Sequence, residues 1–546
     1  MLRRLLPLVA AACVADACAR RDPVTLPDNV RAAADAVDSA RLAADVTYLA
    51  SDALLGRSTP SPGLDSAAAY IVRRLTQSGL TPAGDGGTFL QHYVVRNARR
   101  DTARTWFTLG GRHFREGADF LVISFADSGT VTAPMTYVGH GIRVPKKRID
   151  PFAGVTVKGR IIVAHGPGVL PKGETFGSLG TPISDWVPSQ LVAQQEGAAA
   201  LVLINPPPML TRWARPATRS IGLQSRALSP NPPGAYSGAN FPVLWAKPHV
   251  AAALLASAPQ GVRSVLANGE KRDFVPSFEL PTHVTATIHL GMSSTTELRP
   301  YNVVAVIEGR DRSLRDEYVM LGAHLDGAAE GATAGDTIFN AADDNASGSA
   351  ALLSIAEAMM RGPRPRRSVM FVWDTGEESG LWGSRYFAVH PPVPLERIVT
   401  HFNVDMIGRS KQPGTNVEGE EELAGPEEIY VVGPRVLSTA LDSLLERTNR
   451  DYLGIGLNHT FDRADHPYFF PRTGAAPLVE RGVLTVNVMN GEHGDYHGPG
   501  DEACKLDLRR MHRVTRTIFA SVWMLAETRG RPAMDKRMPA SVQRVP

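Results

Sequence analysis

Hydrophobic residues in the second half of the chain come in short blocks that alternate with amphipathic segments. After Pro300 the strand-like blocks are NVVAVIEG, YVMLGAH, SVMFVWD, THFNVDMIG, IYVVG and LTVNVM. Between them, SGSAALLSIAEAMM and GLWGSRYFAV carry apolar residues at helical spacing. Short apolar strands that alternate with helices predict an α/β fold, in which a mainly parallel, mixed sheet is covered by helices on both faces.

The first half of the chain has two other patterns. Residues 29–80 show helical spacing, which predicts two helices joined by a Gly/Pro loop, the second ended by Gly79. Residues 131–290 contain their own strands, one helix (SQLVAQQEGAAA), and Pro-rich loops at 205–216 and 228–234. This separate alternation predicts an α+β module inserted into the main fold.

A chain of 546 residues is too long for one ordinary core, so more than one domain is expected. We predict five consecutive parts. They are a signal peptide at 1–20, a helical lead-in with the first part of the main domain at 25–125, an inserted module at 126–280, the main domain at 281–530 and a tail at 531–546.

The N-terminus has the features of an export signal. Arg3 and Arg4 precede an apolar run from Leu5 to Ala15, which small residues follow. The run is shorter than the ~20 residues that a membrane-spanning helix needs, and no later segment qualifies, so no transmembrane segment is expected. We expect a periplasmic, outer-membrane-anchored or extracellular protein. Cys18 is a candidate for a lipid anchor, although Ala15 and Asp16 match the bacterial lipoprotein pattern poorly.

Composition narrows the class of protein further. With 43% hydrophobic and 21% charged residues, the chain is typical of a loop-rich globular protein. Its net charge of +3 is small and evenly spread, so nucleic acid is not an expected partner. Of three cysteines, only Cys504 is certain to remain after the signal, so no disulfide framework is expected.

Acidic side chains and one imidazole follow four consecutive predicted elements. These residues are His324, Asp326, Asp343, Asp344, Glu377, Glu378 and Asp405. Because ligands of such sheets bind beyond the carboxyl ends of the strands, we expect these side chains to share one rim.

So many carboxylates would repel one another unless a cation neutralised them. Histidine with several carboxylates suits zinc, with manganese or cobalt as substitutes, and two zinc ions ~3.5–4 Å apart form a known hydrolytic arrangement. A second histidine is required. Spacing does not choose among His459, His466, His493 and His497, each of which could instead make an ordinary polar contact.

Six motifs make the chain recognisable. In order, they are GAHLD, ADDNASG, DTGEESGLWGS, NVDMIG, DRADHPYF and DYHGPGD. The chain resembles the co-catalytic di-zinc exopeptidases, a family that includes leucine-preferring aminopeptidases, glutamate carboxypeptidase and the transferrin receptor. LASDALLGR and SGLTPAGDGGTFLQHY resemble its helical lead-in, and the segment from TYVGHGIR to EGAAALVLINPP resembles the protease-associated domain inserted in many members.

The resemblance implies a metal-ligand set. The ligands would be His324, Asp344, Glu378, Asp405 and His497. Asp344 would bridge two zinc ions, one held by His324 and Asp405 and the other by Glu378 and His497. Asp326 would accept the ring proton of His324 and fix its tautomer.

The resemblance also implies two groups that act on the substrate. Glu377 matches the general base that takes a proton from the attacking water, and Gly376 favours the turn that separates it from Glu378. Tyr496 matches a tyrosine that hydrogen-bonds the developing oxyanion, with a packed aromatic ring as the alternative.

Other motif residues have structural interpretations. Asp343 is read as a helix-start residue. Asp465 and His466 are read as part of the pocket wall. Arg57 and Trp382 would hold the lead-in helices and the loop of Glu377. The link between the last two motifs is longer than usual and adds His493, an alternative to His497 as ligand.

The expected function is therefore a secreted aminopeptidase that acts on peptide or protein substrates. A carboxypeptidase or dipeptidase of the same fold is the first alternative, and it would need a cation such as Arg409, Arg463 or Arg481 to hold a free carboxylate. A non-catalytic binding scaffold is the second alternative. Side-chain preference and oligomeric state are not predicted.

Overall fold

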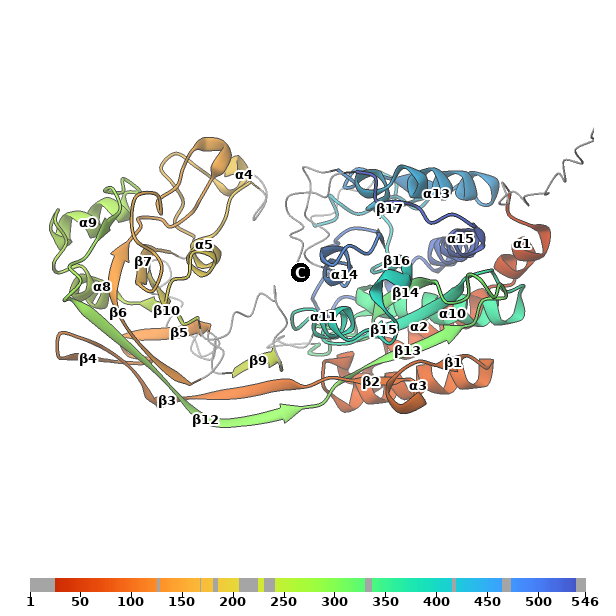
Figure 1. Ribbon diagram of the computed structural model, residues 1–546, viewed down its shortest axis with the longest axis horizontal. Coiled ribbons are helices and arrows are strands. Elements are labelled where there is room, and N and C mark those ends of the chain that lie inside the picture. The colour runs from red at the N-terminus through yellow and green to blue at the C-terminus, as the bar shows by residue number, and fades with distance from the viewer. Residues whose placement is uncertain are drawn as a thin grey trace, which may run out of the picture.

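Two β-sheets organise the chain, each with its own hydrophobic core (Figure 1). The computed structural model describes residues 25–124, 128–166, 168–179, 185–205, 224–229, 241–328, 336–414, 419–463 and 473–536. The predicted signal with Cys18, residues 537–546 of the predicted tail, and Asp465 and His466, which were expected to be structural or pocket-forming, lie outside these ranges. Within the described ranges, no helix combines the length and the apolar character that crossing a bilayer requires.

The first sheet has nine strands, in the order β1-β13-β15-β14-β16-β19-β17-β18, with β2 also paired to β13. The strands are β1 (Thr81–Pro82), β2 (Leu90–His92), β13 (Tyr301–Ile307), β14 (Tyr318–His324), β15 (Ser368–Asp374), β16 (Ile398–Val404), β17 (Glu428–Val432), β18 (Gly456–Asn458) and β19 (Thr485–Met489). The central strands β15, β14, β16 and β19 are parallel to one another, whereas β13 and β17 join the sheet antiparallel. The centre is therefore parallel and the sheet as a whole is mixed.

Helices cover both faces of this sheet, which confirms the predicted α/β class. One core packs the sheet against α1 (Asp28–Asp35), α2 (Ser39–Leu49), α3 (Pro62–Ser78), α10 (Gly348–Arg361), α13 (Thr439–Asp451) and α15 (Leu508–Glu527). A smaller core on the other face involves α11 (Trp382–Val389) and α14 (Ala476–Glu480). The short α12 (Pro434–Leu437) follows β17.

The N-terminal region contains three helices, so the prediction of two was wrong. The break falls between α1 and α2, where the Asp38 side chain accepts hydrogen bonds from the N–H groups of Ala40 and Arg41 and starts a new helix. The end of α3 is as predicted: Gly79 adopts a left-handed conformation, with φ of 77°, that ends the helix.

The second sheet has ten strands, in the order β4-β3-β12-β6-β7-β8-β10-β5, with β11 on β6 and β9 on β3. They are β3 (Val95–Leu109), β4 (Arg112–Arg115), β5 (Phe120–Ser124), β6 (Gly129–Tyr137), β7 (Ile161–His165), β8 (Ala200–Ile204), β9 (Gln224–Leu228), β10 (Val243–Ala246), β11 (Phe278–Glu279) and β12 (Thr285–Leu298). Its helices are α4 (Phe176–Leu179), α5 (Ser189–Gln195), α8 (Pro248–Leu254) and α9 (Val262–Glu270). The sheet thus begins and ends outside the predicted module of residues 126–280.

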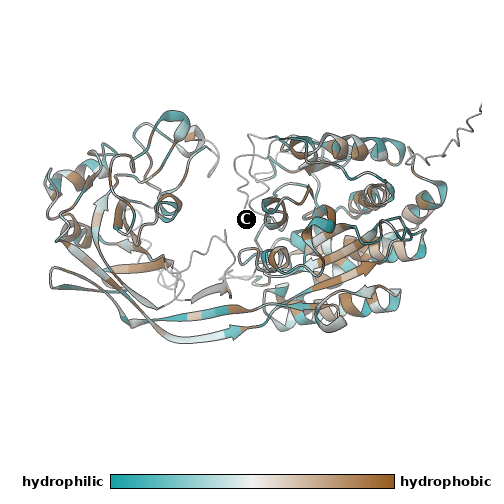
Figure 2. Ribbon diagram, in the orientation of Figure 1, coloured by the Kyte–Doolittle hydropathy of each residue, from teal (hydrophilic) through white to brown (hydrophobic). Residues whose placement is uncertain are grey.

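A long antiparallel ribbon of β3 and β12 connects the two bodies (Figure 1). The pairing runs from Val95 opposite Leu298 to Leu109 opposite Ala286. Figure 2 shows the stretch of this ribbon between the bodies as largely polar, whereas the strands inside the first sheet are hydrophobic. The chain passes from the first sheet to the second along β3 and returns along the neighbouring β12. The second sheet is therefore an insertion in the fold of the first sheet.

Candidate metal centre

The parallel strands of the first sheet deliver polar side chains to one edge. His324 is the last residue of β14, and Asp405 directly follows β16. Glu377 and Glu378 lie three and four residues beyond the end of β15, whose last residue Asp374 pairs with His324. The carboxyl ends of neighbouring parallel strands meet at this rim, as the sequence pattern predicted.

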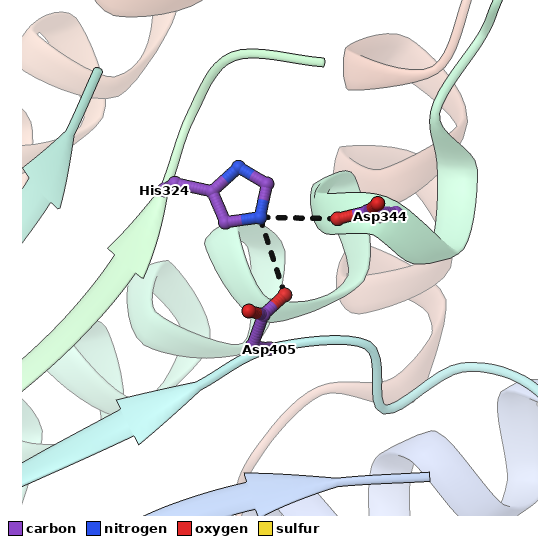
Figure 3. A group of neighbouring side chains, drawn as sticks. All are labelled: His324, Asp344 and Asp405. Carbon is purple, nitrogen blue, oxygen red and sulfur yellow. Dashed lines mark hydrogen bonds and ion pairs between the residues drawn. The ribbon is translucent and has the colours of Figure 1, made fainter. Parts of the chain in front are cut away.

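Two carboxylates lie beside the ring of His324 (Figure 3). Its Nε2 atom lies 3.1 Å from Asp344 Oδ1 and 3.2 Å from Asp405 Oδ1. All three side chains are buried. Asp344 comes from the irregular turn that precedes α10, so a strand end, a loop and a second strand end converge on one point.

A second group surrounds His497. Its Nε2 atom lies 3.2 Å from Asp344 Oδ2 and 2.9 Å from Glu378 Oε2. Asp344 therefore belongs to both groups and presents a different carboxylate oxygen to each histidine. We call these five residues the rim cluster: His324, Asp344, Glu378, Asp405 and His497.

The rim cluster has the donor set and the spacing of a two-metal site. A tetrahedral zinc ion with arms of ~2.0–2.1 Å separates its N and O ligands by about 3.3 Å. The four contacts of the cluster are 2.9–3.2 Å long, close to that separation. In addition, Glu378 Oε1 is buried and has no hydrogen-bond partner among the described residues. These residues fit a pair of divalent cations.

The electrostatics point the same way. In the absence of a cation, burial and the neighbouring Asp344 raise the pKa of Glu378 to about 7. Burial also raises the pKa of Glu377 well above its ordinary value. For His497, burial lowers the pKa, but hydrogen bonds to Asp344 and Glu378 outweigh it and raise the pKa to about 10. The rim thus retains protons that divalent cations would displace.

His324 is oriented through its other ring nitrogen. Nδ1 lies 3.0 Å from the main-chain carbonyl oxygen of Asp326, whereas the nearest carboxylate oxygen of Asp326 is 3.8 Å away. The ring proton therefore goes to the carbonyl and not to the carboxylate that the sequence analysis expected. Either acceptor at Nδ1 would leave the lone pair of Nε2 available to a metal ion at the rim. The Asp326 carboxylate instead accepts the N–H of Glu377 at 3.3 Å.

Gly376 allows the turn that separates Glu377 from the strand. It has φ of 73°, and a Cβ atom there would lie 2.8 Å from the Trp382 ring and 3.0 Å from the hydroxyl of Tyr93. That hydroxyl donates to the carbonyl oxygen of Thr375 at 2.7 Å. Trp382 and Tyr93 thus pack against the loop of Glu377, and Trp382 lies where the sequence analysis placed it.

Arg57 connects the N-terminal segment to the rim. Its buried guanidinium donates to the carbonyl oxygens of Leu325, Asn340 and Ala341, each at 3.0 Å, and also to that of Leu49. Leu325 directly follows His324, so Arg57 connects the N-terminal segment to the backbone next to His324.

Two of the other candidate histidines, His493 and His459, lie outside the rim cluster. His493 is fully buried, with Nε2 3.3 Å from Asp343 Oδ2, whereas the side chain of His497 is 41% exposed at the rim. His459 contacts Glu446 and Asp462. His466 lies outside the described residues. The geometry therefore places His497, and not His493, with Asp344 and Glu378.

Asp343 lies in the first turn of a short irregular helix, Ala342–Ser347, that leads into α10, but its carboxylate does not cap α10. α10 begins at Gly348, whose N–H is accepted by Asn345 Oδ1 at 2.9 Å. The Asp343 carboxylate instead accepts the N–H of Gly408 at 2.6 Å and the side-chain amide of Asn490 at 2.9 Å. These two hydrogen bonds connect the turn before α10 to the loops after β16 and β19.

Asp501 is a supporting residue that the sequence analysis missed. Its carboxylate accepts the backbone N–H groups of Asp343 and Asp344 at 3.0 Å. Asp501 is the last residue of the DYHGPGD motif, so its place beside His497 was the available signal. Asp501 thus connects the segment of His497 to the backbone of Asp344.

A small pocket lies over the rim cluster. Its lining residues are His324, Asp344, Glu377, Asp405, Met406, Thr473, Met489, Glu492 and Tyr496. The Tyr496 ring also stacks on His497, with ring centroids 3.8 Å apart. Arg409 lies outside this lining and is paired with Asp495 at 3.0 Å. No lysine or arginine lines the pocket within the part of the chain that the structure describes.

Comparison with known proteins agrees with this geometry. Residues 302–522, which contain all five residues of the rim cluster, match the model of peptidase family M28. Residues 302–522 form an M28 peptidase domain. The resemblance to the co-catalytic zinc exopeptidases is thereby confirmed, while the protease-associated identity of the inserted module stays a prediction.

Two relatives of the chain are named as a leupeptin-inactivating enzyme and as a leucine aminopeptidase. Over 233 residues the chain is 28% identical to "Leupeptin-inactivating enzyme 1" of Streptomyces exfoliatus, which covers 41% of this chain and 48% of that enzyme. It is 28% identical over 253 residues to "Leucine aminopeptidase 2" of Trichophyton equinum, which covers 43% of this chain and 47% of that enzyme. The chain thus spans about half the length of these relatives.

The fold of the whole chain also has a counterpart. An aminopeptidase from Aneurinibacillus sp. strain AM-1 superimposes with a TM-score of 0.50 over 94% of this chain and 97% of that chain, at 15% sequence identity. At this identity the likeness is one of fold alone. It includes the region of the second sheet, because it extends well beyond the M28 domain.

Proposed function

We propose that this protein is a two-zinc metallopeptidase that removes residues from the amino end of peptides. The observation that carries the proposal is the position of Asp344. Its two carboxylate oxygens face two different histidines, at 3.1 and 3.2 Å, and each histidine has one further carboxylate beside it. A shared carboxylate between two complete ligand groups is the arrangement that a pair of hydrolytic metal ions requires.

When bound, two zinc ions lower the pKa of a water molecule and polarise the scissile carbonyl group. Glu377 borders the pocket and directly precedes Glu378 in the chain. Its role is to accept a proton from the attacking water and to pass it to the departing amine. Burial, which raises the pKa of Glu377, suits a group that must both take and release a proton.

Tyr496 supplies the second protein group. Its side chain lines the pocket beside His497, where its hydroxyl can donate to the oxygen that becomes negative as the carbonyl is attacked. Stacking on His497 restricts the ring, which serves this role and also packs the exposed ligand.

The charge of the pocket favours substrates with a free amino group. Glu377 and Glu492 place two further carboxyl groups in the pocket beside the metal-ligating carboxylates. A carboxypeptidase needs a cation for the free carboxylate, and Arg409, the candidate nearest to the rim in the chain, is paired with Asp495. We therefore prefer the aminopeptidase, and the name of the Trichophyton relative is consistent with that choice.

The test is hydrolysis of aminoacyl chromogenic substrates by the metal-loaded protein, with matched substrates whose amino group is acetylated. We expect hydrolysis of the free-amine series only, and complete loss of it with a chelator. Glu377→Gln should lower kcat by about 10²–10⁴-fold and leave bound zinc unchanged. Turnover of only the acetylated series would refute the aminopeptidase, and normal turnover by Glu377→Gln would refute the mechanism.

Two further proposals concern the rest of the chain. We propose that the protein is exported through its N-terminal signal, because Arg3 and Arg4 precede an apolar run. Detection of the native chain only in the cytoplasm of its own cells would refute export. We also propose that residues 126–280 are a protease-associated domain, whose sheet is completed by β3, β4, β5 and β12. An experimental structure of this region, compared with known protease-associated domains, tests the assignment.

A further inference from the structure

A second group of potential metal ligands lies on α13, apart from the rim cluster and sharing no residue with it. Asp442 and Glu446 are one turn apart on this helix, and His459 directly follows β18. One donor atom from each of these three residues lies within 4.8 Å of the other two. Asp462 contacts His459 through the ring nitrogen Nδ1. We call these four residues the α13 cluster.

Both ring nitrogens of His459 face carboxylates. Nδ1 lies 3.3 Å from Asp462 Oδ2, and Nε2 lies 3.2 Å from Glu446 Oε1. A neutral imidazole has only one N–H, so one of these two contacts needs an extra positive charge, either a second proton or a metal ion. The side chain of His459 is only 4% exposed, which makes an uncompensated contact costly.

Asp462 decides which nitrogen carries the proton. Its carboxylate is held by the backbone N–H groups of Gly433 at 2.8 Å and Arg435 at 2.7 Å. A carboxylate fixed in this way is a strong acceptor for Nδ1–H, as are the groups that orient metal-ligating histidines. The lone pair of Nε2 then faces Glu446 and Asp442.

The spacing at Nε2 matches a metal ligand shell. The 3.2 Å between Nε2 and Glu446 Oε1 is close to the ligand separation of about 3.3 Å around tetrahedral zinc, and it repeats the contacts of the rim cluster. Asp442 Oδ1 is buried and accepts no hydrogen bond from the described residues. Its ion-pair partner, Arg435 Nε, is 3.7 Å away, and a carboxylate oxygen so placed beside an imidazole lone pair is suited to a divalent cation.

Charge balance supports a cation of +2. The cluster holds three carboxylates, and Arg435 lies 3.3 Å from Glu446 and 3.7 Å from Asp442. With a neutral His459 these four groups sum to −2. The Arg435 side chain is 50% exposed, so it can move aside without breaking the core.

We propose that Asp442, Glu446 and His459 bind a further divalent cation, of the zinc class, with Asp462 orienting the histidine. Imidazole with two carboxylates suits zinc and the neighbouring transition metals. Bound there, the ion joins α13 to the segment after β18. This is a structural metal site, independent of the chemistry at the rim.

The experiment counts zinc in the full, untagged chain equilibrated with excess zinc and then freed of unbound metal. We expect one zinc ion fewer in His459→Gln than in the unchanged protein. Titration with zinc should show affinity at this site lowered by at least about 100-fold in His459→Gln. In Arg435→Gln it should be raised about fivefold, because a competing surface cation is removed.

The matched control is His249→Gln. His249 also contacts a carboxylate, Asp119 Oδ1 at 2.9 Å, but only through one nitrogen, and its zinc count should not change. If His459→Gln does not fold, Glu446→Gln replaces it, because that side chain is 40% exposed. Equal zinc counts in the unchanged protein and the variant, or unchanged affinity in Arg435→Gln, would overturn the proposal. Because the readout is a difference in bound zinc, it does not depend on hydrolysis.

Discussion

Two consecutive residues, Asp343 and Asp344, place their carboxylates in very different surroundings. Asp343 is met by protein donors: the N–H of Gly408, the amide of Asn490 and, at 3.3 Å, the ring of His493. Among the described residues, the ion-pair contacts of the Asp344 carboxylate are with His324 and His497 alone. Asp343 and Asp344 are both buried. The Asp343 carboxylate receives hydrogen bonds from the backbone and from an amide, whereas the Asp344 carboxylate faces only the two histidines within the described part of the chain.

The difference distinguishes a structural carboxylate, Asp343, from the proposed metal ligand, Asp344. A buried carboxylate that receives backbone and amide donors is stabilised without a cation. A buried carboxylate that faces only imidazole nitrogens, each shared with another carboxylate, is stabilised only by protons or metal ions. Residue type and burial are the same for both, so the identity of the donors makes the distinction.

The sharpest test of this comparison is Asp344→Asn. We expect kcat/KM to fall by about 10⁴-fold, since several kcal/mol of metal-derived stabilisation of the transition state are lost. Bound zinc should fall with it, which elemental analysis measures alongside the kinetics. Retention of both activity and zinc by this variant would remove the distinction between the two residues.

The two histidines provide a paired test. His497→Gln should lose zinc and lower kcat/KM by about 10³-fold, because one ion loses a ligand. His493→Gln is the matched control and should keep its zinc, since its ring contacts Asp343 and not the rim. Loss of zinc from His493→Gln alone would show that the wrong histidine has been assigned.

Asp343→Asn should affect stability instead of chemistry. It replaces one partner of a buried ionic group, which we expect to lower the free energy of unfolding by about 3 kcal/mol. Chemical denaturation of the metal-loaded protein measures the loss, and zinc analysis serves as the control. A stable variant without zinc would contradict the structural role.

The smallest expected effect concerns the number of protons that the protein releases when it binds zinc. In the metal-free protein, contacts with Asp344 and Glu378 outweigh burial and raise the pKa of His497 from 6.5 to about 10. The stability that this proton contributes is fully present below about pH 6.5 and is lost as the pH rises toward 10.

Because zinc binds the neutral ring, zinc binding at neutral pH should release about one proton from this site. Calorimetric titration in two buffers of different ionisation enthalpy measures it. His497→Gln should release about one proton fewer. Equal release by the two proteins would show that His497 is not a ligand.

Much of this arrangement was predictable from the sequence. The alternation of apolar strands and amphipathic helices after Pro300 predicted the first sheet, because burial on both faces requires continuous apolar strands. His324 ends a strand, Asp405 directly follows one, and Glu377 and Glu378 lie a few residues beyond another, so parallel strands had to bring them to one rim. The order of the motifs then singled out His497 by resemblance.

Other features depended on contacts between segments far apart in the chain. The long pairing of β3 with β12 joins residues almost two hundred positions apart, and its extent follows from cross-strand neighbours that no local pattern displays. The choice of the Asp326 carbonyl as partner of His324, and the role of Asp501, likewise depend on where loops meet.

The sequence by itself determined that the residues at and just beyond the strand ends, His324, Glu377, Glu378 and Asp405, reach the rim, because strand periodicity and strand ends are local properties of the chain. Only the tertiary structure decided what each carboxylate meets there. Asp343 and Asp344 are indistinguishable as residues, and their difference arises from donors on the segments that pack against them, Gly408, Asn490 and His493 for one and His324 and His497 for the other.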